Sequence, residues 1–226
     1  AELAVPEEPE PESGAGAVLG HATGKLLVLL DVNGVLGRRP KEGAYIEGAR
    51  ADKTDLPPGY HGHPSRWYHR PLCSELLREL ENNAALEWGF YTTLTQRNAL
   101  PIVTEVMGRA FPQVVTCTDS RVRVELQAEP KPWFFDQAFC ENDSAELLGG
   151  AAYPQGDRSH WVFALGKVRP QVEARGYRHI VVVTDSERKL WSIPQESQVL
   201  VSEFTEAMVR DPERDIALRD VLVSVQ

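Results

Sequence analysis

Residues 25–32, KLLVLLDV, constrain the fold of this chain more than any other stretch. The run is apolar without alternation, which is typical of a strand that is buried on both faces of a sheet. Residues 86–94 and 178–185 have the same character and predict two more such strands. Apolar residues at helical spacing occupy 74–84 and 95–111. This alternation predicts an α/β fold with a doubly wound, Rossmann-like parallel sheet.

Further segments predict where helices begin and how the chain closes. Ser74 is the predicted N-cap of the first helix, and the second helix is predicted to begin near Ala99. Residues 166–177 predict a short helix, or a loop leading into one. Residues 196–204 predict a further strand, and residues 214–225 predict a closing helix.

Two stretches interrupt the alternation and predict insertions. Residues 37–66 are rich in Gly, Pro and charge, and residues 114–163 contain patterns of short antiparallel strands, so we expect a small β insertion. Insertions at the mouth of a parallel sheet commonly shape the access of a substrate. Residues 1–23 carry few large apolar side chains and predict a flexible acidic leader or linker. The predicted folded domain is then 24–226.

Cysteine and histidine spacing provides no metal-binding motif. The three cysteines lie far apart and form no CxxC pair, so we expect reduced, mostly buried thiols in an intracellular compartment. His61, His63 and His69 lie close together, and an H-x-H pair such as His61 and His63 can bind a metal. No third ligand stands at a fixed spacing from that pair. An ordinary surface loop is therefore expected around these histidines.

Polar side chains follow the predicted strands at the point where each strand ends. Asp31, Thr92 and Asp185 all occupy such positions, and ligands of parallel α/β sheets bind at the carboxyl ends of the strands. An Asp followed by a Gly-containing turn can act as a nucleophile while turn N–H groups face a phosphate. A hydroxyl and a lysine can hold the other phosphoryl oxygens, and a further acid can hold Mg²⁺.

The order of these motifs resembles the haloacid-dehalogenase superfamily. The resemblance is to its branch of RNA-polymerase C-terminal-domain phosphatases, also called NLI-interacting-factor-like phosphatases. It runs from about Lys25 to the C-terminus and rests on LLDVNGVL, YHRPLCSELLREL, GFYTTLTQRNALPIV, ALGKVRPQVEARGY and VVVTDSERKLW. The resemblance implies Asp31 as nucleophile and Mg²⁺ ligand, Asp185 as a second ligand, and Thr92 and Lys167 as phosphate-binding residues.

Two positions depart from the family pattern. Asn33 stands where the family has the Asp that protonates the leaving oxygen and activates water, and an amide does not titrate. Asn33 stays a candidate catalytic position and Mg²⁺ ligand by its place in the motif. Thr184 stands where the last motif has its first metal-binding carboxylate. Either Asp185 swings in or the strand slips by one residue, or else Mg²⁺ affinity falls because hard cations prefer charged oxygens.

Three functions are consistent with these residues. The leading hypothesis is a weakened or inactive phosphatase-fold protein that binds or assembles other proteins. The second is an active Mg²⁺-dependent phosphatase that acts on phosphoserine or phosphothreonine in a protein through a phosphoaspartyl intermediate. The third is a component of a large ribonucleoprotein assembly. The residues do not decide between nucleus and mitochondrion.

Net charge and hydropathy narrow the partners. A net charge of −9 counts against direct contact with nucleic acid, which needs basic residues to replace counterions. The sequence contains no run of about 18 apolar residues, so no transmembrane segment is predicted. We therefore expect a protein partner or a phosphoprotein substrate, with membership of a larger complex as one form of partnership.

Overall fold

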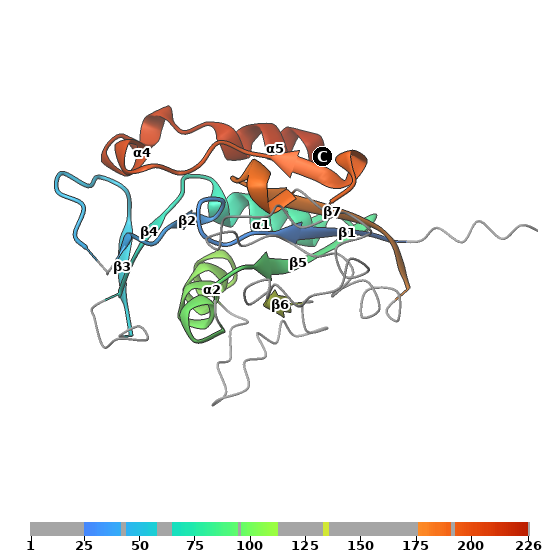
Figure 1. Cartoon of the computed structure of the whole chain (residues 1–226), viewed down its shortest axis with the longest axis horizontal. Coiled ribbons are helices and arrows are strands. Elements are labelled where there is room, and N and C mark those ends of the chain that lie inside the picture. The colour runs from blue at the N-terminus through green and yellow to red at the C-terminus, as the bar shows by residue number, and fades with distance from the viewer. Residues whose placement is uncertain are drawn as a thin grey trace, which may run out of the picture.

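A five-stranded parallel sheet forms the centre of the computed structural model, which describes residues 25–41, 44–57, 65–94, 96–112, 133–135, 176–190 and 193–225. Strand β1 (Lys25–Leu30) lies in the middle, between β5 (Leu86–Thr92) and β7 (Tyr177–Thr184) (Figure 1). The outer strands are β6 (Trp133–Phe135) and β8 (Gln198–Leu200), and every pairing is parallel. The predicted α/β fold with its parallel sheet is confirmed.

The strand order also locates a crevice. The order β6-β5-β1-β7-β8 has the first strand of the chain in its middle, and the chain crosses to opposite sides of β1 to form β5 and β7. In open α/β sheets this reversal opens a crevice at the carboxyl ends of the two strands beside it. Here those strands are β1 and β7, and Asp31 and Thr184 lie at their ends.

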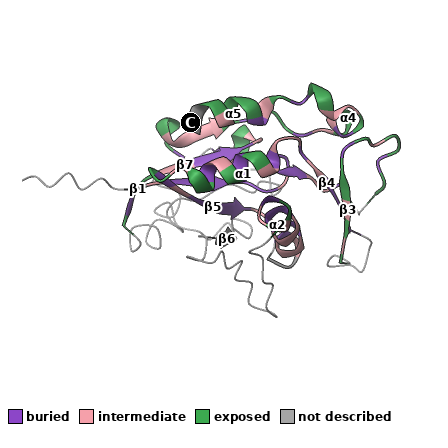
Figure 2. Cartoon of the chain, turned by 180° about the vertical axis from the view of Figure 1, so that it is seen from behind, coloured by how far each residue is buried: buried purple, intermediate pink, exposed green. Residues whose placement is uncertain are grey.

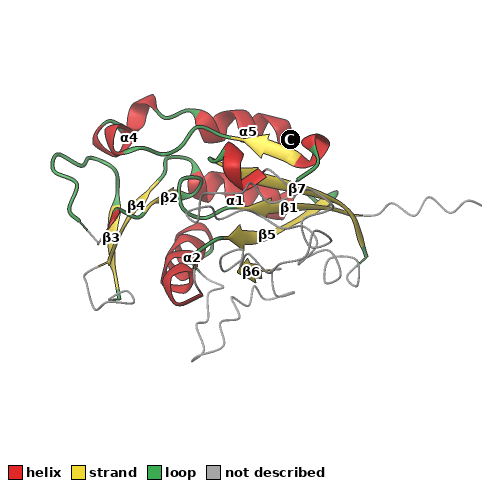
Figure 3. Ribbon diagram, viewed as in Figure 1, coloured by secondary structure: helices red, strands yellow, loops and turns green. Residues whose placement is uncertain are grey.

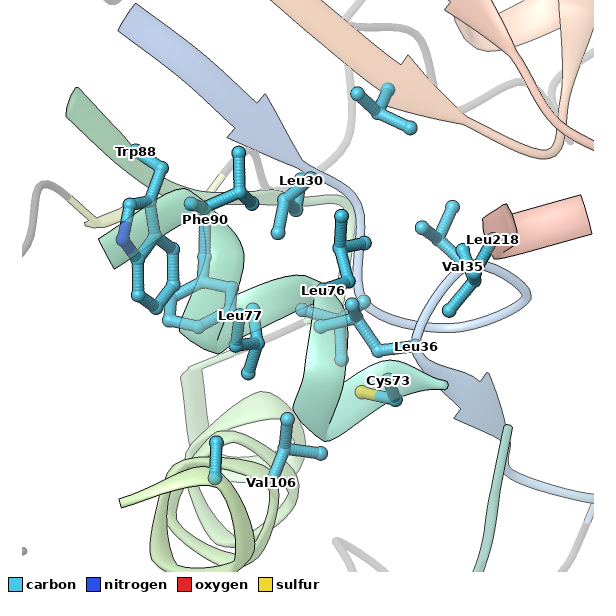
Figure 4. Packing of buried hydrophobic residues seen from close by; sticks show 14 of the residues in the cluster. Leu30, Val35, Leu36, Cys73, Leu76, Leu77, Trp88, Phe90, Val106 and Leu218 are labelled. Atoms are coloured by element: carbon cyan, nitrogen blue, oxygen red, sulfur yellow. The ribbon is translucent and has the colours of Figure 1, made fainter. Parts of the chain in front are cut away.

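Alternate side chains of β1 enter two separate clusters, which explains its unbroken apolar sequence. Val28 and Leu30 pack with α1 (Cys73–Asn82), α2 (Gln96–Ala110) and α5 (Ala217–Val225) (Figure 4). Leu27 and Leu29 pack on the opposite face with Val182 and with Leu190 of the 3₁₀ turn η2 (Glu187–Leu190). In Figure 2 the strands β1, β5 and β7 are largely purple, whereas α1 and α5 carry green outer faces. Both faces of β1 are therefore dry, as the sequence predicts.

The interruption at 37–66 contains a second sheet that the sequence analysis did not locate. Strands β2 (Gly37–Arg38), β4 (Ser65–His69) and β3 (Lys53–Leu56) are antiparallel, in the order β2-β4-β3 (Figure 3). Tyr68 of β4 packs with Phe204 and with Val209 of α4 (Glu206–Arg210). This small sheet is thus fixed to the C-terminal segment.

Two predicted helix starts were wrong. Helix α1 begins at Cys73, and its N-cap is Leu72 in the left-handed region with φ 63°, because the carbonyl of Leu72 accepts the first helical hydrogen bond. Helix α2 begins at Gln96, so Pro101 lies inside it and not in its first turn. An interior Pro removes one helical hydrogen bond, which the packing of α2 against the core offsets.

Some of the other sequence predictions fall on residues that the structure describes, and the rest fall outside them. The strand predicted at 196–204 is confirmed over Gln198–Leu200 alone, as β8, and the helix predicted at 214–225 is confirmed over Ala217–Val225, as α5. The 3₁₀ turns η3 (Gln195–Ser197) and η4 (Pro212–Arg214) take up residues at the start of each predicted range. Residues 1–23, most of 166–177, and all of 114–163 except β6 lie outside the described residues. The leader and the second insertion therefore stay predictions. Among the described helices, none has the length and apolar character needed to cross a bilayer.

Cys73 behaves as an inert core thiol. It is buried in the main cluster, and burial raises the pKa of the thiol to about 12, with a smaller contribution from Glu75. A thiol with this pKa is protonated at neutral pH and is a poor nucleophile. Cys117 and Cys140 lie outside the described residues.

Two glycines are expected to respond in opposite ways to alanine. A Cβ at Gly37 would lie 2.4 Å from the carbonyl oxygen of Tyr68 and 2.4 Å from Trp67, whereas a Cβ at Gly108 in α2 would meet nothing within 4 Å. We expect Gly37→Ala to destabilise the chain by about 2 kcal/mol or more through overpacking, and Gly108→Ala to stabilise it by about 0.5–1 kcal/mol through helix propensity. Urea unfolding of both variants measures this contrast, and equal effects would contradict it.

His69 lies in strand β4 and belongs to a partly buried hydrogen-bonded network, so the prediction of an ordinary surface loop was wrong for this residue. Its Nε2 lies 3.0 Å from Oγ1 of Thr54, and that hydroxyl donates to Glu105 at 2.7 Å. Because the single hydroxyl proton goes to the carboxylate, Nε2 of His69 donates to Thr54. The contact of 3.5 Å between His69 and Glu105 has the spacing of an ion pair. Burial and Arg109 nevertheless lower the pKa of His69 to about 4, against the smaller opposite effects of Glu105 and Asp52, so the imidazole is neutral at pH 7.

This network predicts acid sensitivity. Between pH 6.5 and pH 4 the unfolded chain protonates His69 and the folded chain does not, so the free energy of unfolding falls as the pH falls. The expected loss from pH 7 to pH 5 is about 1–2 kcal/mol. His69→Gln keeps an N–H donor without a titrating group and is the matched variant. Urea unfolding at the two pH values should show a smaller loss in His69→Gln, and an unchanged loss would contradict the assignment.

Candidate functional site

The carboxylate of Asp31 lies buried at the carboxyl ends of β1 and β7. Asp31 directly follows β1, and its backbone N–H donates to the carbonyl of Val183 at 2.9 Å. Its Oδ1 accepts from the backbone N–H of Val32 at 2.8 Å. The residue is only 1% exposed. A buried carboxylate of this kind needs charged or hydrogen-bonding partners.

Two residues from the β7 side provide those partners. Thr184 donates its hydroxyl to Oδ2 of Asp31 at 2.9 Å. Lys189 places its Nζ 2.5 Å from the same Oδ2 and 3.7 Å from Oδ1 of Asp185. The Lys189 ammonium thus lies near both acids that the resemblance implies as Mg²⁺ ligands.

The charges in this cluster depend on one another. Burial lowers the pKa of Lys189, but Asp31 and Asp185 raise it by more, so its pKa lies above the ordinary lysine value. Burial raises the pKa of Asp185, as do Asp31 and Glu203, while Lys189 lowers it, and the sum is a raised pKa. Lys189 is therefore protonated near neutral pH, and its positive charge reduces the repulsion between Asp31 and Asp185.

Gly34 allows Asp185 to approach the loop after β1. Gly34 has φ +93°, and a Cβ there would lie 1.7 Å from Oδ2 of Asp185. Only glycine fits, because both the backbone conformation and the carboxylate exclude a side chain. The Asp185 carboxylate therefore lies directly against the backbone that follows Asp31 and Asn33.

The side chain of Asn33 stabilises the loop that carries it. Its Oδ1 accepts from the backbone N–H of Arg39 at 2.8 Å, and its backbone forms an isolated bridge with Gly37. The amide oxygen that the resemblance offers to a metal or to water is thus bonded to the chain. A catalytic or metal-binding role for Asn33 stays a prediction.

The two predicted phosphate-binding residues have different outcomes. Thr92 ends β5 at the same edge of the sheet as Asp31 and is fully buried, and its Oγ1 accepts from the backbone N–H of Leu94 at 3.2 Å. Lys167 lies outside the described residues. The sequence analysis missed Lys189, although its spacing of four residues from Asp185 was a signal.

Arg70 holds the loop of the site in place. Its guanidinium binds Asp215 with two hydrogen bonds of 2.6 and 2.9 Å, and it also donates to the carbonyls of Gly34 at 2.9 Å and Ser202 at 2.7 Å. Both charged side chains are almost fully buried. The sequence analysis used the Arg-Pro pair only as a motif, yet Arg70 joins the loop after β1 to the chain between β8 and α5.

The donor set around Asp31 does not fit Mg²⁺ as it stands. Mg²⁺ needs near-octahedral oxygen ligands at about 2.0–2.1 Å. Both oxygens of Asp31 are bonded to protein groups, the amide oxygen of Asn33 is bonded to Arg39, and an ammonium occupies the space between Asp31 and Asp185. Within the described part of the chain, no three His, Cys, Asp or Glu residues form a group that could hold a metal ion.

Comparison with known proteins provides distant structural likenesses. No family model and no curated protein matches the chain. A structure described as Fcp1, an essential RNA polymerase II CTD phosphatase, has 15% identity and a TM-score of 0.39, and it covers 90% of this chain and 52% of its own. A structure of a variant of the fission yeast RNA polymerase II CTD phosphatase Fcp1 bound to beryllium fluoride has 18% identity and a TM-score of 0.27. That match covers 41% of this chain and 29% of the Fcp1 chain. At these values neither likeness assigns a function.

Proposed function

We propose that the chain is a phosphatase-fold protein with little or no turnover that serves as a protein-binding or assembly module. The observation that carries this proposal is the ion pair of 2.5 Å between Lys189 and Asp31. A phosphoryl-accepting carboxylate needs an oxygen free to attack phosphorus. In Asp31, Oδ1 is held by Val32, and Oδ2 is held by both Thr184 and Lys189.

The residue two positions after Asp31 supports the same proposal. Asn33 has no titrating group, and general acid–base catalysis is typically worth about 10²–10⁴-fold in rate. Its amide oxygen also already accepts a hydrogen bond from the backbone N–H of Arg39. Loss of the acid–base group together with a paired nucleophile reduces turnover by two independent routes.

Hydrolysis of an activated aryl phosphate in the presence of Mg²⁺ tests the proposal. We expect the wild-type chain and Asp31→Asn to give the same rate, because Asp31 is not used as a nucleophile. Asn33→Asp is also expected to remain inactive, because Lys189 still holds Asp31. Turnover by the wild type that disappears in Asp31→Asn would overturn the proposal.

The alternative is an active Mg²⁺-dependent phosphoprotein phosphatase. One observation favours it: Asp31 lies at the carboxyl end of β1 beside the sheet reversal, with Thr92 at the end of the neighbouring strand. In that case a phosphate would pair with the Lys189 ammonium in place of Asp31, and the Asp31 carboxylate would become free to attack. Wild-type turnover abolished by Asp31→Asn is the result that this alternative requires.

The binding role has its own test. If the crevice is not used for catalysis, a stoichiometric protein partner should copurify equally well with the wild type and with Asp31→Asn from native extracts. Size-exclusion chromatography of the tagged chain measures this. A chain that elutes as a free monomer from its native extract would contradict the module.

A further inference from the structure

We propose that the Lys189 ammonium is the resident cation of this crevice, and that it excludes Mg²⁺ from the position between Asp31 and Asp185. The inference concerns the ion that balances these acids and not turnover. It rests on the same ion pair as the proposed function, but its tests measure metal binding and not turnover, so the failure of one can be told from the failure of the other.

Geometry supports the exchange of one cation for another. The ammonium lies within 2.5 Å of an Asp31 oxygen and 3.7 Å of an Asp185 oxygen. The hydroxyl of Thr184 lies 2.9 Å from that same Asp31 oxygen. These are the oxygen types that a hard divalent cation prefers, so the surroundings of Nζ are those of a cation site.

The backbone around Lys189 keeps the ammonium in that position. The N–H of Lys189 donates to the carbonyl of Ser186 at 3.0 Å, which forms the 3₁₀ turn η2. The next residue, Leu190, is 1% exposed and belongs to the cluster on the second face of the sheet. Gln198 of β8 donates to the carbonyls of Leu190 and Ile193 at 3.2 and 2.6 Å. The turn is thus fixed at both its core and its C-terminal side.

Electrostatics decides which cation is bound. Among the described residues that meet at this point, two carboxylates face one ammonium, whereas Mg²⁺ beside the ammonium would put two cations in a buried space. Displacing the ammonium would remove Lys189 from both acids while its stem stays anchored by η2. The ammonium and a Mg²⁺ ion bound to the same two carboxylates would repel each other strongly where water is excluded. Mg²⁺ therefore binds only when Lys189 is removed.

Thermal unfolding with and without about 10 mM Mg²⁺ tests this inference, because a ligand that binds only the folded state raises the melting temperature with the logarithm of its concentration. The wild-type melting temperature should move by less than about 1 °C. Lys189→Ala should melt about 5–10 °C lower in EDTA, since two acids lose their cation, and should regain several degrees in Mg²⁺ or Mn²⁺. Arg188→Ala, at the exposed neighbour, is the matched control and should behave as the wild type.

A second variant ties the response to this site. Lys189→Ala combined with Asp185→Asn should lose the metal-dependent rise, and salt of equal ionic strength should not reproduce it. If Lys189→Ala does not fold, Lys189→Gln keeps the length of the side chain without its charge, and Mn²⁺ binding to it is measured by calorimetry. A wild-type stabilisation by Mg²⁺ that Asp185→Asn abolishes would overturn the inference. A folded Lys189 variant that binds neither metal would also overturn it.

Discussion

Replacing Arg70 by Met is expected to destabilise the chain by about 3–5 kcal/mol, because breaking a buried ion pair leaves an uncompensated charge. The substitution leaves the carboxylate of Asp215 buried without its cation. It also removes the donors to the carbonyls of Gly34, Val35 and Ser202. Asp215 accepts from the backbone N–H of Ala217 as well, so the start of α5 is affected too.

Urea unfolding measures the loss, and an exposed arginine controls for it. Arg78 pairs with Glu75 at 3.5 Å, but both side chains are about half exposed. Arg78→Met should therefore change the free energy of unfolding by less than about 0.5 kcal/mol. Adding Asp215→Leu to Arg70→Met should restore part of the stability, because it removes the unpaired charge. Equal effects of Arg70→Met and Arg78→Met would contradict the role of Arg70.

The second large effect is expected at the pair of Asp31 and Lys189. Lys189→Met should cost about 3 kcal/mol, because it leaves Asp31, which is 1% exposed, without its cation. Asp31→Asn should cost less, about 1–2 kcal/mol, because the amide oxygen can still accept from Val32, the amide nitrogen can donate to the Thr184 hydroxyl, and Lys189 keeps Asp185 as a partner. The two changes together should cost less than their sum, with a coupling of about 1–3 kcal/mol.

The coupling is obtained from a double-mutant cycle by urea unfolding. Arg50 and Glu213 form the matched exposed pair, with a contact of 3.4 Å and side-chain exposures of 62% and 81%. Screening by water should keep the coupling of that pair near zero. Additive costs at Asp31 and Lys189 would show that the contact contributes nothing to folding.

The sequence predicted the elements whose pattern of apolar residues matches the way they are buried. Strand β1 and the C-terminal parts of β5 and β7 are largely apolar on both faces, and α1 and α5 carry apolar residues at helical spacing, so the local pattern and the tertiary environment agree there. The sheet β2-β4-β3 was missed because β2 and β3 are short and carry polar residues, and because the sheet depends on contacts of Tyr68 in β4 with Phe204. Such tertiary contacts leave no periodic signal in the sequence.

The site was predictable in part. Asp31, Thr92 and Asp185 were located because the carboxyl ends of parallel strands share one edge of the sheet. Lys189 was not, because its role depends on the direction in which a four-residue 3₁₀ turn points its side chain. The bond from Asn33 to Arg39 likewise depends on how the chain folds back within six residues. Sequence position identifies residues near a crevice more readily than it identifies their partners.

The order of the strands has a consequence for synthesis of the chain. Asp31 and Lys189 are separated by 158 residues, and Arg70 and Asp215 by 145. At a typical elongation rate, roughly 8–30 s pass between the emergence of β1 and that of its partner β7. During that interval the edge of β1 that later pairs with β7 is open, Asp31 lacks Lys189, and Arg70 lacks Asp215. The nascent chain is therefore expected to depend on ribosome-associated chaperones until β7 and α5 have emerged.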